Sequence, residues 1–148
     1  DRTFVAQGAE VEIDTQTGNV RVVKLVSVND VGLAINPSNA ENQVFGGLHQ
    51  GLGYALSEEI KVESGKVTNP SFRDYGILRA PDMPEMECYF VEKGNGPGPY
   101  GAKGLGEQPN VPTAAAVANA VHDAIGVRIK SLPLTPEKIL SALREKGK

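Results

Sequence analysis

The sequence has one cysteine, no tryptophan and no long apolar run, and each shortage excludes a class of protein. A single cysteine, Cys88, cannot form an internal disulfide framework and is typical of a reducing compartment. No apolar stretch approaches the roughly 20 residues that cross a bilayer, and the chain opens on Asp1 without a basic and apolar leader. The net charge of −3 gives no sign of a polyanionic partner. We therefore expect a cytoplasmic protein that binds neither nucleic acid nor membranes.

Side chains that hold metals or act as nucleophiles are also scarce. His49 and His122 stand alone, so there is no Cys/His cluster for zinc or an iron–sulfur centre, and we expect both histidines to be structural. No Gly-x-Ser-x-Gly turn is present. Residues 96–103 lack the Ser or Thr that follows the lysine of a nucleotide-binding P-loop. By elimination, Glu107 is the best candidate for acid–base chemistry.

Glycine is abundant immediately before this glutamate. Six of the 13 residues from 94 to 106 are glycine, and the run ends at Glu107. Glycine loses more conformational freedom on folding than any other residue, so such a run indicates close backbone approach or positive φ angles. Glu107 then either complements the N-terminus of a following helix or faces a ligand. The residues alone leave both interpretations open.

Hydrophobic periodicity predicts a single domain over residues 1–148, with an α+β fold and a mixed β-sheet. The expected order is approximately ββαββαβα. The expected helices span 38–57, 109–125 and 135 to the basic C-terminus, and residues 68–84 are expected to form a loop. The expected strands span 3–14, 20–28, 60–67, 85–92 and 127–132. The segment 60–67 is either a strand or a hairpin arm that turns at 64–65.

The first predicted helix carries an unusual number of glycines. Ser38 and Glu41 have the spacing of a capping box, and Gln43 and Gln50 share one face, where two amides could bind a polar ligand. Each interior glycine costs about 0.8–1 kcal/mol relative to alanine. Either close packing or a ligand on that face could explain them. The four glycines are Gly46, Gly47, Gly51 and Gly53.

Each of the first two predicted helices has one stripe of apolar residues that should face the core. In the first helix the stripe is Val44, Leu48, Leu52 and Ala55, and in the second it is Ala114, Val117, Val121, Ala124 and Ile125.

Two motifs resemble a known family. Residues 43–53, Gln-Val-Phe-Gly-Gly-Leu-His-Gln-Gly-Leu-Gly, and residues 101–107, Gly-Ala-Lys-Gly-Leu-Gly-Glu, are similar to the C-terminal part of the large, molybdopterin-binding subunit of the xanthine dehydrogenase and aldehyde oxidase family. Shorter matches at 30–32, 36–37 and 132–136 fall in the expected order, so the resemblance covers essentially the whole chain. It implies the fold of the molybdenum cofactor-binding domain.

The resemblance also implies a chemistry. These enzymes are molybdenum hydroxylases that oxidise an aldehyde or N-heteroaromatic substrate with water as the oxygen source, and Glu107 matches their general base. The pterin holds the molybdenum, so the protein need supply no metal ligand. The molybdopterin form is left open and includes the cytosine dinucleotide. The positions implied in cofactor binding are Gln43, Lys103, Gly104, Leu105 and Gly106.

The family's iron–sulfur clusters and FAD would lie on partner domains or subunits. We therefore expect this chain to be a fragment or a split subunit that is inactive alone, needs the remaining molybdopterin-domain polypeptide, and self-associates when isolated. The alternative is a non-catalytic pterin-binding or subunit-assembly module. Two positions depart from the family pattern: Asn42 replaces a common glycine, and Gln108 separates Glu107 from the proline that usually follows it.

Overall fold

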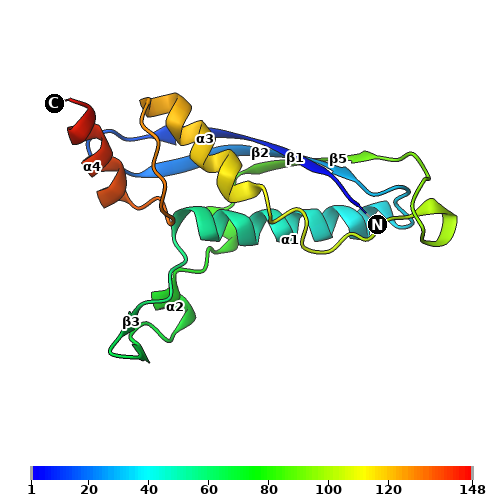
Figure 1. Ribbon diagram of the computed structural model, residues 1–148, viewed down its shortest axis with the longest axis horizontal. Coiled ribbons are helices and arrows are strands. Elements are labelled where there is room, and N and C mark those ends of the chain that lie inside the picture. The colour runs from blue at the N-terminus through cyan, green and yellow to red at the C-terminus, as the bar shows by residue number, and fades with distance from the viewer. Residues whose placement is uncertain (1, 148) are drawn as a thin grey trace.

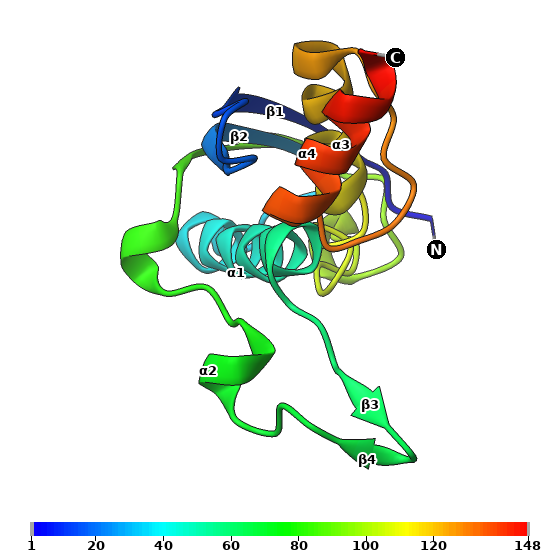
Figure 2. The ribbon, with the colours of Figure 1, turned by 90° about the vertical axis from the view of Figure 1, so that its left-hand side faces the viewer.

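A three-stranded sheet with two helices packed on one face carries the fold (Figures 1 and 2). The computed structural model describes residues 2–147. The sheet has the order β1-β2-β5, which confirms the predicted α+β class with a mixed sheet. The main elements are β1 (Val5–Ile13), β2 (Val20–Asp30), α1 (Pro37–Leu56), β5 (Glu85–Val91), α3 (Thr113–Ile125) and α4 (Pro136–Lys146); the smaller ones are β3 (Val62–Glu63), β4 (Lys66–Val67), α2 (Phe72–Tyr75) and the 3-10 turns η1 (Ala80–Asp82) and η2 (Pro99–Gly101).

Strands β1 and β2 form the predicted antiparallel hairpin. The pairing register shifts between Glu10 and Val11, so that β2 carries one extra residue there. Val22 and Leu25 are three residues apart, yet both are buried, because the bulge changes the phase of the alternation. The hairpin therefore presents one continuous apolar face to the helices.

Strand β5 pairs with β2 in parallel, from Lys24 opposite Glu85 to Asp30 opposite Val91. Parallel pairing brings the C-terminal ends of both strands to the same end of the sheet. The chain leaving β2 and the chain leaving β5 thus start side by side, where α1 begins (Figure 1). Cys88 lies within β5 and is half-buried, and burial raises the pKa of its thiol to about 11, which keeps it protonated and unreactive at neutral pH.

Helix α1 begins one residue earlier than predicted and has a different cap. The Asn36 side chain accepts a hydrogen bond from the Asn39 N–H at 3.1 Å, and Pro37 occupies the first helical turn. The predicted Ser38–Glu41 capping box is therefore wrong, because an asparagine followed by proline already starts the helix. The predicted core stripe is confirmed: Val44, Leu48, Leu52 and Ala55 are all buried.

Helix α3 is shorter than predicted. It begins at Thr113, because residues 109–112 form turns rather than helix. Val117, Val121 and Ile125 are buried as expected, whereas Ala124 is exposed. Gly126 ends the helix with a φ of 67°, a conformation suited to glycine.

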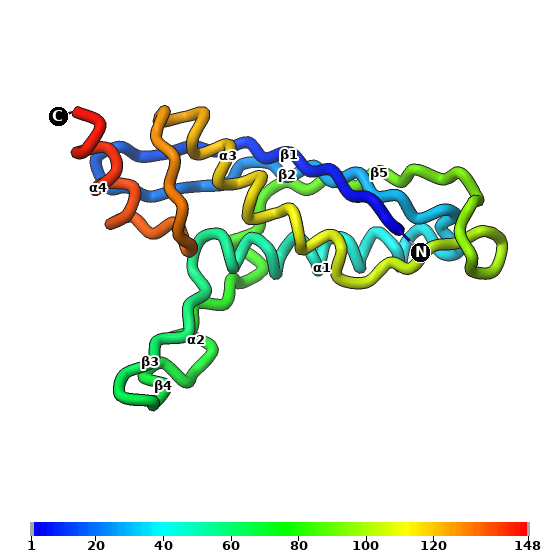
Figure 3. Tube along the Cα trace, viewed as in Figure 1, coloured from blue at the N-terminus to red at the C-terminus, as the bar shows by residue number. Residues whose placement is uncertain are grey.

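The strand predicted at residues 127–132 is wrong, since this described segment forms neither strand nor helix. Val127 and Ile129 do alternate with exposed neighbours and pack on the core. The segment runs past α3 toward the end of α1 (Figure 3), where the Leu134 N–H donates to the Ala55 carbonyl. Because it runs beside helices and not beside the sheet, it has no strand to pair with. The start of α4 is as predicted, with Thr135 accepting a hydrogen bond from the Lys138 N–H.

An arm between α1 and β5 projects from the body of the molecule (Figures 1 and 2). Its two short strands form the predicted hairpin at Ser64 and Gly65, but α2 and η1 replace the predicted loop over 68–84. Within residues 2–147, no helix is long and apolar enough to cross a membrane. Large apolar side chains of the arm are exposed, namely Ile60, Val62, Val67, Phe72 and Ile77.

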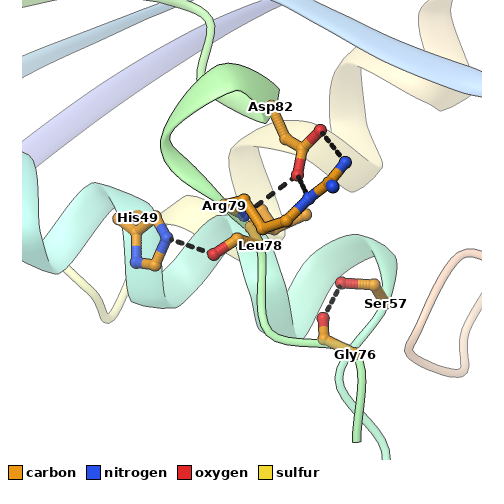
Figure 4. Close-up of polar contacts among 6 residues, drawn as sticks. All are labelled: His49, Ser57, Gly76, Leu78, Arg79 and Asp82. Atoms are coloured by element: carbon orange, nitrogen blue, oxygen red, sulfur yellow. Dashed lines mark hydrogen bonds and ion pairs between the residues drawn. The ribbon is translucent and has the colours of Figure 1, made fainter. Parts of the chain in front are cut away.

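Polar contacts tie the base of this arm to α1 (Figure 4). A ring nitrogen of His49 lies 3.0 Å from the Leu78 carbonyl oxygen, and the Ser57 hydroxyl donates to the Gly76 carbonyl at 2.6 Å. His49 therefore has the structural role predicted for it. The arm is therefore fixed at its base, although its apolar side chains are exposed.

Candidate functional site

The first part of the glycine loop packs against backbone rather than against side chains. The Gly94 N–H donates to the Gly32 carbonyl at 2.6 Å, and the Lys103 N–H donates to the Val31 carbonyl at 2.8 Å. Gly32 and Gly101 have φ angles of 67° and 79°, and a Cβ on either would collide with a backbone carbonyl. Gly32 is explained by the close approach of the β2 exit to the loop, and Gly101 by the close approach of the loop to its own start at Gly94.

Three glycines of the two motifs have no such explanation among the described residues. A Cβ at Gly104 or Gly106 would meet nothing within 4 Å, and the same holds for Gly46 on α1. By contrast, Gly47 lies against Pro109 in the turns before α3, and Gly51 lies against Thr113, the first residue of α3. The two interpretations of the glycine-bearing helix therefore apply to different residues: some allow close packing, and Gly46 leaves an open surface.

Gln43 joins this helix to the loop. Its Nε2 donates to the Gly106 carbonyl at 3.0 Å, so Gly46, one helical turn further along α1, lies on the same side as the loop. The side chain of Gln50, predicted to act with it, donates instead to the Tyr54 hydroxyl at 2.8 Å. The structure thus brings together Gln43 and Gly106, which are 63 residues apart in sequence.

Glu107 is exposed at the end of this loop. Among the described residues, no side chain bonds to its carboxylate, and its carbonyl accepts from the Asn110 N–H at 3.0 Å. Helix α3 begins only at Thr113, with Pro112 at the cap position, so Glu107 lies outside the first turn. The helix-capping interpretation is therefore wrong, and the carboxylate is free to face a ligand.

The side chain of Lys103 has a partner inside the chain. Its Nζ lies 2.7 Å from Asp30 Oδ2, and the Lys103 side chain is only 7% exposed. The ammonium therefore fixes the loop to the end of β2, and a cofactor contact from this position would have to use its backbone. Leu105, two residues after Lys103, is half-buried and packs against the core. In the described residues, no group of three or more His, Cys, Asp or Glu side chains could hold a metal ion.

This ion pair makes a pH-dependent contribution to stability. The hydrogen bond from Lys103 and a second one from the Gly32 N–H hold the pKa of Asp30 below its ordinary value of 3.8. A carboxyl whose pKa is lowered by folding stabilises the fold above its unfolded-state pKa and loses that contribution as the pH falls through its folded-state pKa. We expect Asp30→Asn to lower the melting temperature at pH 7 and to flatten its fall below pH 4. An unchanged acid profile in melting curves would contradict the assignment.

A buried polar chain that the sequence analysis missed anchors the exit of the loop. Gln7 Nε2 donates to the Pro109 carbonyl, and the Thr113 hydroxyl donates to Gln7 Oε1 at 2.8 Å. Gln7 also reaches Ser27 on β2, whose hydroxyl accepts from Asn29 Nδ2 at 3.1 Å. Buried polar groups must be paired. The one signal in the sequence was a glutamine on the inward face of β1.

The fold and this site define a class. Residues 2–84 match the family model described as Molybdopterin cofactor-binding domain, and the chain belongs to that family. The match covers Gln43 and confirms the family inferred from the two motifs, whereas Glu107 and the glycine loop lie beyond it.

Particular relatives carry more specific names. The chain is 43% identical over 139 residues, 93% of its length, to the xanthine dehydrogenase molybdenum-binding subunit of Escherichia coli O157:H7. It is 40% identical over 89% of its length to the 6-hydroxypseudooxynicotine dehydrogenase complex subunit gamma of Paenarthrobacter nicotinovorans. The aldehyde oxidoreductase from Desulfovibrio gigas has the same fold over 96% of the chain, with a TM-score of 0.88 and 34% identity. The chain spans 18%, 17% and 15% of these three proteins, respectively.

Proposed function

We propose that this chain forms one wall of the active site of a molybdenum hydroxylase, with Glu107 as the general base. The observation that carries the proposal is the hydrogen bond from Gln43 to Gly106, which joins the open surface at Gly46 on α1 to the loop that carries Gly104, Gly106 and the exposed Glu107. Such glycines permit a large ligand to approach the backbone closely. The named relatives, which include a xanthine dehydrogenase subunit and an aldehyde oxidoreductase, support the same reaction class.

The residues present fit a molybdenum–molybdopterin cofactor. Gln43 uses Nε2 to hold the loop, which leaves Oε1 as an acceptor for an N–H of the pterin. Backbone groups of Gly104, Leu105 and Gly106 would line the same surface. When bound, the cofactor supplies the redox chemistry, and the protein supplies position and electrostatics. The Glu107 carboxylate would accept the proton released from water as the substrate carbon is hydroxylated.

The substrate class and the partners belong to the same proposal. An aldehyde or an N-heteroaromatic compound is the class supported by the relatives' names. The rest of the cofactor pocket would come from the remaining molybdopterin-domain polypeptide, with iron–sulfur and FAD centres on further domains or subunits. The exposed apolar side chains of the arm, among which Phe72 is 79% exposed, support contact with such a partner. The single unpaired thiol of Cys88 is compatible with a cytoplasmic enzyme.

A substitution series at Gly46 tests the proposed cofactor surface. Alanine and leucine have similar helix propensities, and each should stabilise α1 by about 0.8–1 kcal/mol relative to glycine. Neither meets an obstacle close to Cβ within the chain. If a cofactor lies against this face, Gly46→Leu should lower the molybdenum content of the purified assembled enzyme severalfold, while Gly46→Ala should lower it much less.

The measurements are metal analysis and melting temperature on the same preparations. The size series controls for helix propensity, since only the bulk of the side chain differs between the two variants. Full molybdenum content in Gly46→Leu would contradict the placement of the cofactor against α1.

A further inference from the structure

Two glutamine side chains hold the peptides on both sides of Gly106. Gln108 Oε1 accepts from the Gly106 N–H at 2.8 Å, and Gln108 Nε2 donates to the Gly104 carbonyl. On the other side, Gln43 Nε2 donates to the Gly106 carbonyl at 3.0 Å. The peptide before Gly106 and the peptide after it are therefore both fixed by side-chain amides.

Leu105 packs against the core, but the two glycines beside it have no packing restraint of their own. Gly104 and Gly106 have no Cβ, and even an added one would meet no neighbour within 4 Å, so packing does not select their conformation. A glycine without such restraint samples a wide range of φ and ψ. The Cα of Glu107 follows directly on the peptide that Gln43 holds, so rotation at Gly106 would move the carboxylate.

The backbone next to Gln108 is itself held in place. The next residue, Pro109, is buried, its carbonyl accepts a hydrogen bond from Gln7 Nε2, and the Thr113 hydroxyl oxygen lies 3.0 Å from the same carbonyl oxygen. The sheet and α3 therefore fix the backbone from which the Gln108 side chain reaches back to Gly104 and Gly106. This arrangement transmits the rigidity of the core to the two glycines of the loop, Gly104 and Gly106.

We propose that Gln108 is a positioning residue, which fixes the Gly104–Gly106 backbone and thereby aims the Glu107 carboxylate at the reacting atoms. The inference rests on the proposed function, because it assigns Gln108 a purpose relative to a general base. It also explains why a glutamine between Glu107 and Pro109 is compatible with the site. The side chain closes a local clamp and does not point into the pocket as a further ligand.

The test is Gln108→Met in the assembled enzyme, because methionine keeps the length of the side chain and removes both hydrogen bonds. We expect hydrogen–deuterium exchange of the Gly106 amide to accelerate about tenfold, as for loss of one hydrogen bond. We expect kcat to fall roughly ten- to a hundredfold, the cost of misplacing a catalytic group by about 1 Å. KM, molybdenum content and melting temperature should stay close to those of the parent enzyme.

Two further variants make the result specific. Gln16→Met is the matched control. Gln16 lies in the exposed turn between β1 and β2, far in sequence from Gln108, so this substitution should change none of these quantities. Gln108→Glu keeps an acceptor for the Gly106 N–H but replaces the donor to the Gly104 carbonyl by an oxygen, so exchange of that amide should be slower than in Gln108→Met and faster than in the parent enzyme. Unchanged exchange or unchanged kcat in Gln108→Met would overturn the proposal.

Failure of the proposed function would look different. If Glu107→Gln retained activity while Gln108→Met still accelerated exchange at Gly106, the clamp would exist but would not serve a base. That result would overturn both the general base and the positioning role. A loss of activity in Glu107→Gln with no effect of Gln108→Met would overturn only the positioning role.

Discussion

Replacing Glu107 by glutamine should lower kcat of the assembled enzyme by roughly 10²- to 10⁴-fold, the usual contribution of a positioned general base. Glutamine has nearly the same shape as glutamate but cannot accept the proton. Glu107 is exposed, and no side chain of the described residues bonds to its carboxylate, so the fold should not depend on its charge. Molybdenum content and melting temperature should therefore be unchanged.

Steady-state kinetics with metal analysis measure both expectations. Glu10→Gln is a suitable control, because Glu10 is an exposed glutamate on β1 at the outer face of the sheet. A turnover number close to that of the parent enzyme in Glu107→Gln would contradict the assignment of Glu107 as the general base. It would favour the alternative in which the chain is a non-catalytic pterin-binding or assembly module.

The second large effect concerns stability and separates two kinds of glycine in one loop. Gly101→Ala should destabilise the fold by roughly 2–5 kcal/mol, since the left-handed backbone costs about 1–2 kcal/mol for an L-residue and overpacking against backbone costs about 1–3 kcal/mol more. The φ of Gly101 is 79°, and its added Cβ would collide with the Gly94 carbonyl. Because the obstacle is backbone, no side chain can move aside to relieve it.

Gly104→Ala, three residues later, is the matched control. Its Cβ would meet nothing within 4 Å, so the free energy of unfolding should change by less than about 0.5 kcal/mol. Denaturant unfolding of both variants decides the matter. Equal destabilisation by the two substitutions would show that the loop does not pack as described.

The sequence predicted the local elements well where the signal was periodic or chemical. The β1–β2 hairpin, the core stripe of α1 and the Thr135–Pro136 helix start are all present. The errors arose where a pattern fitted more than one structure. The alternation at 127–132 looks like a strand, but the chain there crosses the helices and finds no partner.

By itself, then, the sequence determined the fold class, the family and the identity of Gln43 and Glu107 as candidates, because motifs and hydrophobic periods are properties of neighbouring residues. Only the tertiary structure decided which glycines serve packing and which leave a surface open, since that depends on contacts across more than 60 residues, such as Gln43 with Gly106. It also showed that Lys103 is held by Asp30 and that Gln108 holds the loop. The Lys103–Asp30 pair depends on the parallel pairing of β2 with β5, which brings the ends of the two strands together. The Gln108 contacts are local, and they depend on the anchoring of the neighbouring Pro109 by Gln7.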